Sequence, residues 1–164
     1  MIVAIHDANI LIDIVKLDLA DALFELSFEM RTTDAVWVEV SVEQRRVLQH
    51  YVDEGLLGIE SFCSEEVLDI VEYSRNYNGL SFQDCSLLVA ARRIHALIIT
   101  GDKKLRTVIV QEQLEVHGML WLFDRLVENQ ILIPSVAADK LHQLRLLNVR
   151  LPEAEINQRI SRWR

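Results

Sequence analysis

Four acidic residues occupy positions from which an α/β fold could bring them together: Asp7, Glu39, Asp84 and Asp102. Asp7 directly follows the apolar segment 2–6, and Asp102 follows the apolar segment 96–100 after one glycine. Because the carboxyl ends of parallel strands meet at one edge of a sheet, we expect these two carboxylates to lie close together. Asp84 lies in the first turn of a helix that leads into segment 96–100, and Glu39 can lean toward the same edge.

A cluster of carboxylates is the kind of site that binds a hard divalent cation. Like charges raise one another's pKa and destabilise the fold, and oxygen-bound Mg²⁺ or Mn²⁺ removes that cost. Mg²⁺ held by a few carboxylates keeps several waters, which leaves room for a phosphate oxygen and an attacking water. The chemistry expected here is therefore metal-assisted hydrolysis of a phosphodiester.

Each carboxylate alone also has an ordinary structural explanation. Asp7 and Asp102 could each cap a helix, which is worth about 1 kcal/mol. Residues 81–84, Ser-Phe-Gln-Asp, match a capping box, and Glu39 alone would sit on a solvated helix face. The metal-site prediction therefore rests on the order of the four residues and their common edge of the sheet.

The elements that must position these residues alternate between short apolar segments and longer helical ones. This alternation predicts an α/β fold with a parallel sheet. The predicted strands are 2–6, a short one around 31–32, 57–62, 96–100 and 114–117. The predicted helices are 8–16, 18–28, 34–53, 64–77, 81–95, 103–113, 119–129, 135–147 and a basic helix from 152 to the end, so that Glu39 lies about one turn into its helix.

Composition favours one globular domain. The chain has 164 residues, 51% of them hydrophobic, and no apolar run approaches the roughly 18 residues of a membrane span. The N-terminus lacks the basic segment of a signal peptide, so we expect a cytoplasmic protein without a membrane partner. We divide the chain into a catalytic unit at 1–133 and a C-terminal helical extension at 134–164 that packs on or near it.

The net charge of −8 argues against a protein that coats nucleic acid by neutralising phosphates, although an enzyme acting on nucleic acid is compatible with it. Cys63 and Cys85 lack metal-ligand spacing, and we expect two buried, unpaired thiols.

Among the remaining polar and aromatic residues, His6 is expected to be packed, and Asp13 to stay outside the cluster. Trp37 and Trp121 are expected in the core or an interface, and Trp163 is interpreted as an interface anchor. The basic C-terminal residues form either a solvated face or an arm that contacts RNA or a partner; they include Arg159, Arg162 and Arg164.

Four motifs, in this order, resemble the PIN (PilT N-terminus) domain family of small nucleases, which includes the VapC-like toxins. They are Asp7-Ala8-Asn9, then Thr32-Thr33 followed by Glu39, then Asp84 ahead of a helix of small residues, and finally Thr100-Gly101-Asp102. The ordered set covers roughly residues 1–130. The resemblance implies a three-layer α/β/α sandwich with a central parallel sheet, here extended by C-terminal helices.

The resemblance also implies Mg²⁺- or Mn²⁺-dependent cleavage of RNA, with the four acids as both catalytic residues and metal ligands. Asn9 and Thr100 would support them by hydrogen bonding. Many family members carry a further acidic or polar residue after the last Asp, whereas this chain has Lys103-Lys104-Leu105-Arg106, whose cations could hold a phosphate backbone. A homodimer and an antitoxin partner are further expectations of the resemblance, and the alternative function is a non-catalytic PIN-like module that binds RNA or protein.

Overall fold

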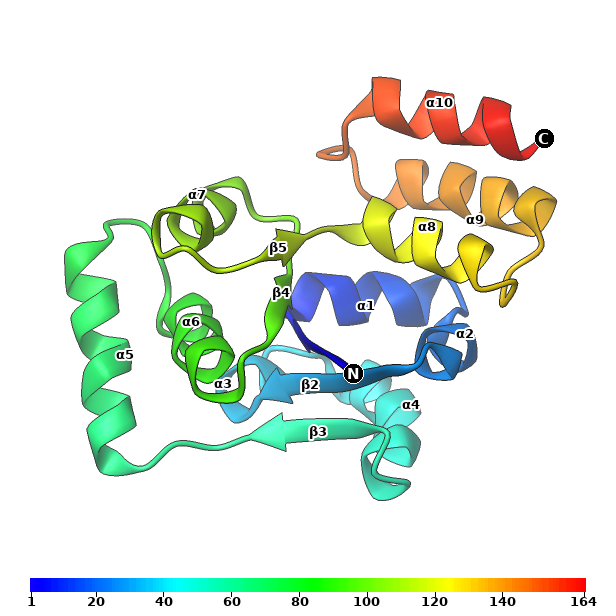
Figure 1. Ribbon diagram of the computed structural model, residues 1–164. Helices are drawn as coiled ribbons and strands as arrows, with labels where there is room; N and C mark the ends of the chain where they lie inside the picture. Colours follow the sequence, from blue (N-terminus) through cyan, green and yellow to red (C-terminus); the bar gives the residue numbers. More distant parts are fainter.

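Five short parallel strands form the centre of the molecule in the computed structural model, which describes residues 1–164 (Figure 1). The strands are β1 (Ile2–His6), β2 (Phe28–Thr33), β3 (Leu57–Glu60), β4 (Leu97–Ile99) and β5 (Val116–His117), in the order β3-β2-β1-β4-β5. β1 pairs with both β2 and β4, and His6 is in register with Ile99. The predicted parallel sheet is thus confirmed, with the two strands that precede Asp7 and Asp102 as neighbours.

Ten helices surround this sheet in a three-layer α/β/α arrangement. They are α1 (Ala8–Lys16), α2 (Ala20–Glu25), α3 (Asp34–Trp37), α4 (Val42–Asp53), α5 (Ser64–Asn76), α6 (Phe82–Ile94), α7 (Lys103–Gln111), α8 (Met119–Glu128), α9 (Pro134–Leu147) and α10 (Glu153–Trp163). α1, α2, α4 and α8 lie on one side of the sheet, and α5, α6 and α7 lie on the other (Figure 1). None of these helices is both long and apolar enough to cross a membrane.

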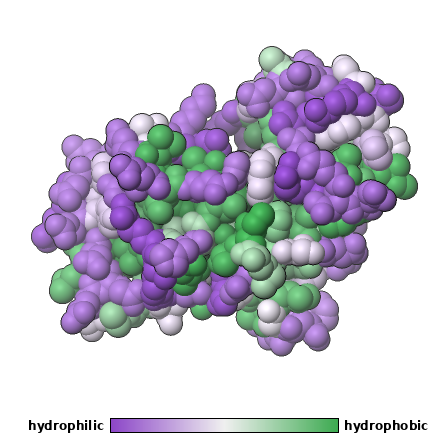
Figure 2. Space-filling view, viewed as in Figure 1, coloured by the Kyte–Doolittle hydropathy of each residue, from purple (hydrophilic) through white to green (hydrophobic).

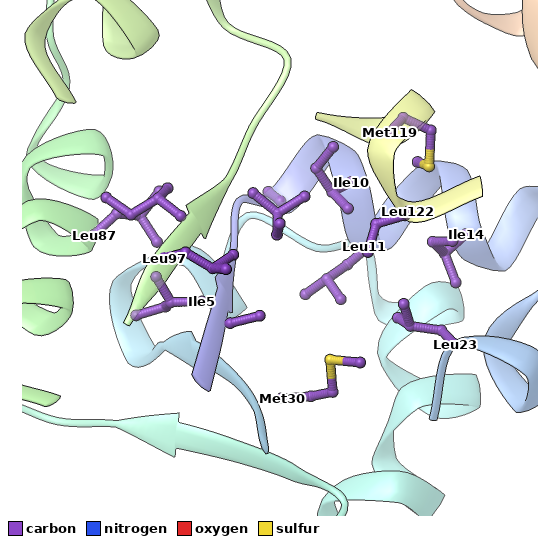
Figure 3. Close-up of a cluster of buried hydrophobic side chains, with 14 of the residues drawn as sticks. Ile5, Ile10, Leu11, Ile14, Leu23, Met30, Leu87, Leu97, Met119 and Leu122 are labelled. Atoms are coloured by element: carbon purple, nitrogen blue, oxygen red, sulfur yellow. The ribbon is translucent and has the colours of Figure 1, made fainter. Parts of the chain in front are cut away.

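The core is one continuous cluster of 43 buried hydrophobic residues. Ile5 and Leu97 from neighbouring strands lie near Leu87 of α6, and Leu11 and Ile14 of α1 fill the opposite side (Figure 3). In the space-filling view, hydrophilic residues cover most of the outer helices while hydrophobic residues reach the surface near the middle of this face (Figure 2). The apolar faces of strands and helices thus account for the sandwich that positions the site.

The predicted helix 34–53 is in fact two helices. Thr33 caps α3, whose four residues end before Glu39, and Ser41 then caps α4 by accepting from the Gln44 amide. The Ser41 hydroxyl also donates to the Gln44 side chain at 2.7 Å, so Ser-x-x-Gln marks a new helix start. Glu39 therefore lies in the turn between the two helices and not one turn into a single helix.

The predicted helix 18–28 is also shorter than expected. α2 ends at Glu25, and Phe28 is the first residue of β2, where it is in register with Ile2 of β1. Strand pairing with residues 2–5 of β1 therefore outweighs the local helical tendency of the segment.

The C-terminal helices pack on the same core. The Lys140 ammonium of α9 donates to the Leu17 carbonyl at 2.6 Å, and Ile156 of α10 is fully buried. Arg159 of α10 donates to both oxygens of Asp124 on α8, at 2.9 and 2.7 Å. Trp163, interpreted above as an interface anchor, is instead 8% exposed and stacks on Phe123 inside the molecule.

Cys63 is exposed, contrary to the expectation of a buried thiol, because it is the N-cap residue of α5 on the surface. Ser64, where the predicted helix 64–77 begins, is also the first residue of α5. Cys85 is buried in α6, and burial raises the pKa of its thiol to about 11. Neither cysteine forms a disulfide.

Candidate metal centre

Asp7 is held in one orientation at the carboxyl end of β1. Its backbone amide donates to the Ile99 carbonyl at 3.0 Å, which continues the pairing of β1 with β4. One carboxylate oxygen accepts from the Ala8 amide and the other from the Thr100 hydroxyl, both at 2.7 Å. Only 6% of the residue is exposed, so the carboxylate is fixed within the edge of the sheet.

Thr100 connects Asp7 to Asp102. While its hydroxyl donates to Asp7, the same oxygen accepts from the Asp102 amide at 3.2 Å. Asp102 caps α7 by accepting from the Leu105 amide at 2.8 Å, and its second carboxylate oxygen has no protein donor. One buried hydroxyl thus ties together the two strand-end acids.

Asp84 is positioned by the capping box expected at the start of α6. Its amide donates to the Ser81 hydroxyl at 3.0 Å, and the Ser81 amide donates back to one Asp84 carboxylate oxygen at 2.9 Å. The other oxygen of Asp84 has no protein donor. Capping therefore orients Asp84 and leaves half of its carboxylate available to a ligand.

A chain of buried hydroxyl groups joins α3, which precedes Glu39, to α6, which carries Asp84. The Ser86 hydroxyl donates to the Gln83 carbonyl at 2.6 Å, so the Thr33 hydroxyl must be the donor of the 2.8 Å bond to Ser86. Thr33 in turn accepts from the Val36 amide at 3.0 Å. Sequence reasoning missed Ser86, whose only signal was a polar residue inside an otherwise apolar helical stretch.

The Asp7 carboxylate is close enough to Glu39, Asp84 and Asp102 for their charges to interact. Burial, followed by the charges of Asp84 and Asp102, raises the pKa of Asp7 despite the hydrogen bonds from Thr100 and Ala8. Burial also raises the pKa of Glu39, and the charges of Asp7 and Asp84 add to this shift. Residues from four separate segments therefore share one negative electrostatic environment.

The donor set fits a hard divalent cation in its chemistry, since it offers several carboxylate oxygens without protein donors. Nevertheless, the structure contains no group of three or more His, Cys, Asp or Glu side chains in an arrangement that could hold a metal ion. Waters and a phosphate oxygen would complete the coordination of an ion here, as is usual for Mg²⁺. Asp13 lies apart: burial raises its pKa, and Asn148 and Lys16 are its partners.

The other residues predicted for the site are placed less centrally. Asn9 is exposed and its side chain makes no hydrogen bond within the chain, so the supporting role expected for it stays a prediction. Lys103 and Lys104 are exposed on α7, and the Lys104 ammonium lies over Gly79, where a Cβ atom would be only 2.9 Å away. His6 is fully buried as expected, and burial lowers its pKa to about 4.

A cavity between α5 and α6 lies away from the acidic edge. It has a volume of about 590 Å³ and is lined by Glu66, Asp69, Glu72, Tyr73, Asn76, Val89, Arg92 and Arg93 of α5 and α6. None of the four carboxylates lines it. The candidate metal centre is therefore an edge of the sheet outside this cavity.

Comparison with known proteins assigns the fold. The family model described as a PIN domain matches residues 3–164. No curated protein matches the chain. The crystal structure of PAE2754 from Pyrobaculum aerophilum is similar, with a TM-score of 0.54 and 13% identity, over 77% of this chain and 98% of that chain. At this identity the structural likeness supports the fold alone.

Proposed function

Because the chain belongs to the PIN domain family, whose members are generally nucleases, we propose that it is a divalent-metal-dependent ribonuclease acting at the acidic edge. Two observations support the proposal: the Thr100 hydroxyl joins Asp7 to Asp102, and the buried Asp7 carboxylate also experiences repulsion from the charges of Asp84 and Asp102. A fold tolerates such repulsion when a bound cation offsets it. The family match makes RNA phosphodiesters the substrate class to test.

In this proposal, Asp7 and Asp102 are the main Mg²⁺ or Mn²⁺ ligands, and Thr100 fixes their relative position. Asp84 and Glu39 complete the site, directly or through water. When bound, the cation would lower the pKa of a water and stabilise charge developing on the phosphate. The protein itself contributes orientation, since Asp7 and Asp84 each have at least one oxygen fixed by a backbone amide.

The second candidate is a non-catalytic PIN-like module that binds RNA or protein. The lack of a preassembled three-residue metal cluster favours it over the enzyme. The unused oxygens of Asp84 and Asp102 favour the enzyme, because a module without a metal has no need of them. The toxin role, an antitoxin partner, a homodimer and a cytoplasmic location extend the same proposal through the family resemblance.

The proposal is tested by incubating the purified chain with a mixture of RNAs, with Mn²⁺ or with EDTA. We expect cleavage by the wild type in Mn²⁺ and none in EDTA or with Asp7→Asn. Asp13→Asn is the matched control, because Asp13 lies in α1, the helix that Asp7 caps, but outside the cluster. Cleavage that survives EDTA or Asp7→Asn would contradict the mechanism, and no cleavage by a folded wild type would favour the binding module.

A further inference from the structure

The first turns of α7 carry three cations beside the acidic edge: Lys103, Lys104 and Arg106. None of the three forms an ion pair with a carboxylate of the chain, and the first turn of α7 contains no acidic residue. Cations at the amino end of a helix oppose its dipole, so this arrangement costs stability locally. Local costs of this kind concentrate at functional sites.

Arg106 is the member of this group that reaches the site. One guanidinium nitrogen, Nη1, donates to the Thr100 carbonyl at 3.1 Å, and Thr100 is the residue that contacts both Asp7 and Asp102. Gly118 makes room for this approach, because a Cβ atom at that position would lie 3.1 Å from Nη1. The guanidinium is thereby held at the carbonyl of Thr100 and lies one helical turn after Asp102, without an ion pair to a carboxylate.

Most of the hydrogen-bonding capacity of Arg106 is unused. A guanidinium has five N–H donors, and the Thr100 carbonyl is the only protein acceptor that Arg106 contacts. The guanidinium nitrogens of Arg106 that have no protein partner are not buried, so they are accessible to solvent. By contrast, the partly buried Arg31 and Arg159 are both paired with carboxylates.

We propose that Arg106 binds an internucleotide phosphate of single-stranded RNA next to the bond to be cleaved. This inference rests on the proposed ribonuclease function and names the residue that holds the substrate. The planar guanidinium offers paired donors that match phosphate oxygens, and anchoring to Thr100 fixes their direction. A local cation of this kind also explains how a chain with a net charge of −8 approaches a polyanion.

The test measures the affinity of a fluorescently labelled single-stranded RNA oligonucleotide by anisotropy over a range of salt concentrations. The Asp7→Asn protein is the background, so that the RNA stays intact. Adding Arg106→Met should weaken binding roughly 10-fold, as expected for a charged hydrogen bond. It should also lower the slope of log affinity against log salt by about 0.7, the value for one phosphate contact on a single strand.

The matched control is Arg150→Met, because Arg150 is exposed on the connection between α9 and α10. It should change the affinity by less than about 2-fold. An equal loss from both variants would mean diffuse attraction and would overturn the assignment, as would an unchanged affinity for Arg106→Met.

A purely structural role for Arg106, as a brace for Thr100, makes a different prediction. Mn²⁺ affinity, measured in protein that retains Asp7, should be unaffected by Arg106→Met if the residue binds RNA, and should fall with the RNA affinity if it is a brace. If Arg106→Met does not fold, Arg106→Lys decides the matter, because a point charge without the paired donors should bind RNA several-fold more weakly. An unchanged affinity of Arg106→Lys would then overturn the proposal.

The outcome is separable from that of the ribonuclease proposal. RNA affinity that depends on Arg106 in a wild type that cleaves nothing would support this phosphate contact and contradict the ribonuclease. Metal-dependent cleavage by a protein whose RNA affinity does not depend on Arg106 would support the ribonuclease and contradict this phosphate contact.

Discussion

Thr100 occupies the central position among the candidate site residues. Its hydroxyl donates to Asp7 and accepts from the Asp102 amide, while its carbonyl accepts from Arg106. A residue of this type satisfies two buried polar groups at once and fixes the geometry of charged neighbours that would otherwise separate. The position of both strand-end acids therefore depends on one side chain that carries no charge.

The raised pKa of Asp7 leads to a prediction about pH. In the metal-free protein, an acid with a raised folded pKa destabilises the fold above that pKa. This cost disappears as the pH falls through the raised value toward the ordinary 3.8. As the pH falls from about 8 to about 4.5 in EDTA, the Tm of the wild type should therefore rise relative to the Tm of Asp7→Asn.

Thermal unfolding at several pH values measures this difference. Asp69→Asn, on the exposed surface of α5, is the control for the loss of an acid outside the cluster. A constant or oppositely directed difference for Asp7→Asn would show that the Asp7 carboxylate carries no such cost.

At the residue scale, sequence patterns mark the positions of the acids and of Thr100, whose role in a metal site stays a prediction, but they do not mark Ser86 or the contact of Arg106. Asp7, Asp84 and Asp102 stand at strand ends or helix caps, which have recognisable sequence patterns. Ser86 and the anchoring of Arg106 depend on contacts between segments that are far apart in the chain, and Asn9 makes no hydrogen bond. Such contacts have no local sequence signal.

At the scale of elements, the hydroxyl chain between α3 and α6 determines how the segments bearing Glu39 and Asp84 lie relative to each other. Both hydroxyls, Thr33 and Ser86, are fully buried. Glu39 follows α3 in a turn and has no hydrogen bond of its own that would hold its carboxylate. Its placement therefore relies on the helix before it and on this connection.

Ser86→Ala should lower the free energy of unfolding by about 1–3 kcal/mol, because it leaves the buried Thr33 hydroxyl without its acceptor. It should also weaken Mn²⁺ binding, since α6 carries Asp84. Denaturant unfolding and Mn²⁺ titration measure the two effects. Ser161→Ala, on the exposed side of α10, should change neither.

A comparably destabilising change far from the site, Leu144→Ala in α9, separates the two effects. It should reduce stability by roughly 2–5 kcal/mol without altering the Mn²⁺ affinity of the folded protein. If Ser86→Ala weakens Mn²⁺ binding no more than Leu144→Ala does, the hydroxyl chain is structural only.

Element types were predictable from periodicity, and element ends less so. The strand from Ile2 to His6 and the helix from Ala8 to Lys16 are as predicted. The split between α3 and α4 was missed because the second cap, Ser41, falls inside a run that is helical by pattern on both sides. The extra length of β2 comes from pairing with β1, which is a tertiary effect.

At the scale of the whole molecule, the chain forms one core that includes its C-terminal helices. Ala137, Leu141 and Ile156 belong to the same buried cluster as the strands. Arg159 is committed to Asp124, so the basic end of the chain is attached to α8. The division at residue 133 remains a prediction, and the PIN domain match continues through these helices to residue 164.

The central claim is that four carboxylates of one sheet edge form a single divalent-metal site. A Mn²⁺ titration of the wild type and single variants, followed by calorimetry, tests it most directly. Asp7→Asn, Glu39→Gln, Asp84→Asn and Asp102→Asn should each weaken binding by roughly 10-fold or more, whereas Asp13→Asn should leave it unchanged. The absence of saturable Mn²⁺ binding by the wild type, or an equal loss with Asp13→Asn, would contradict the account.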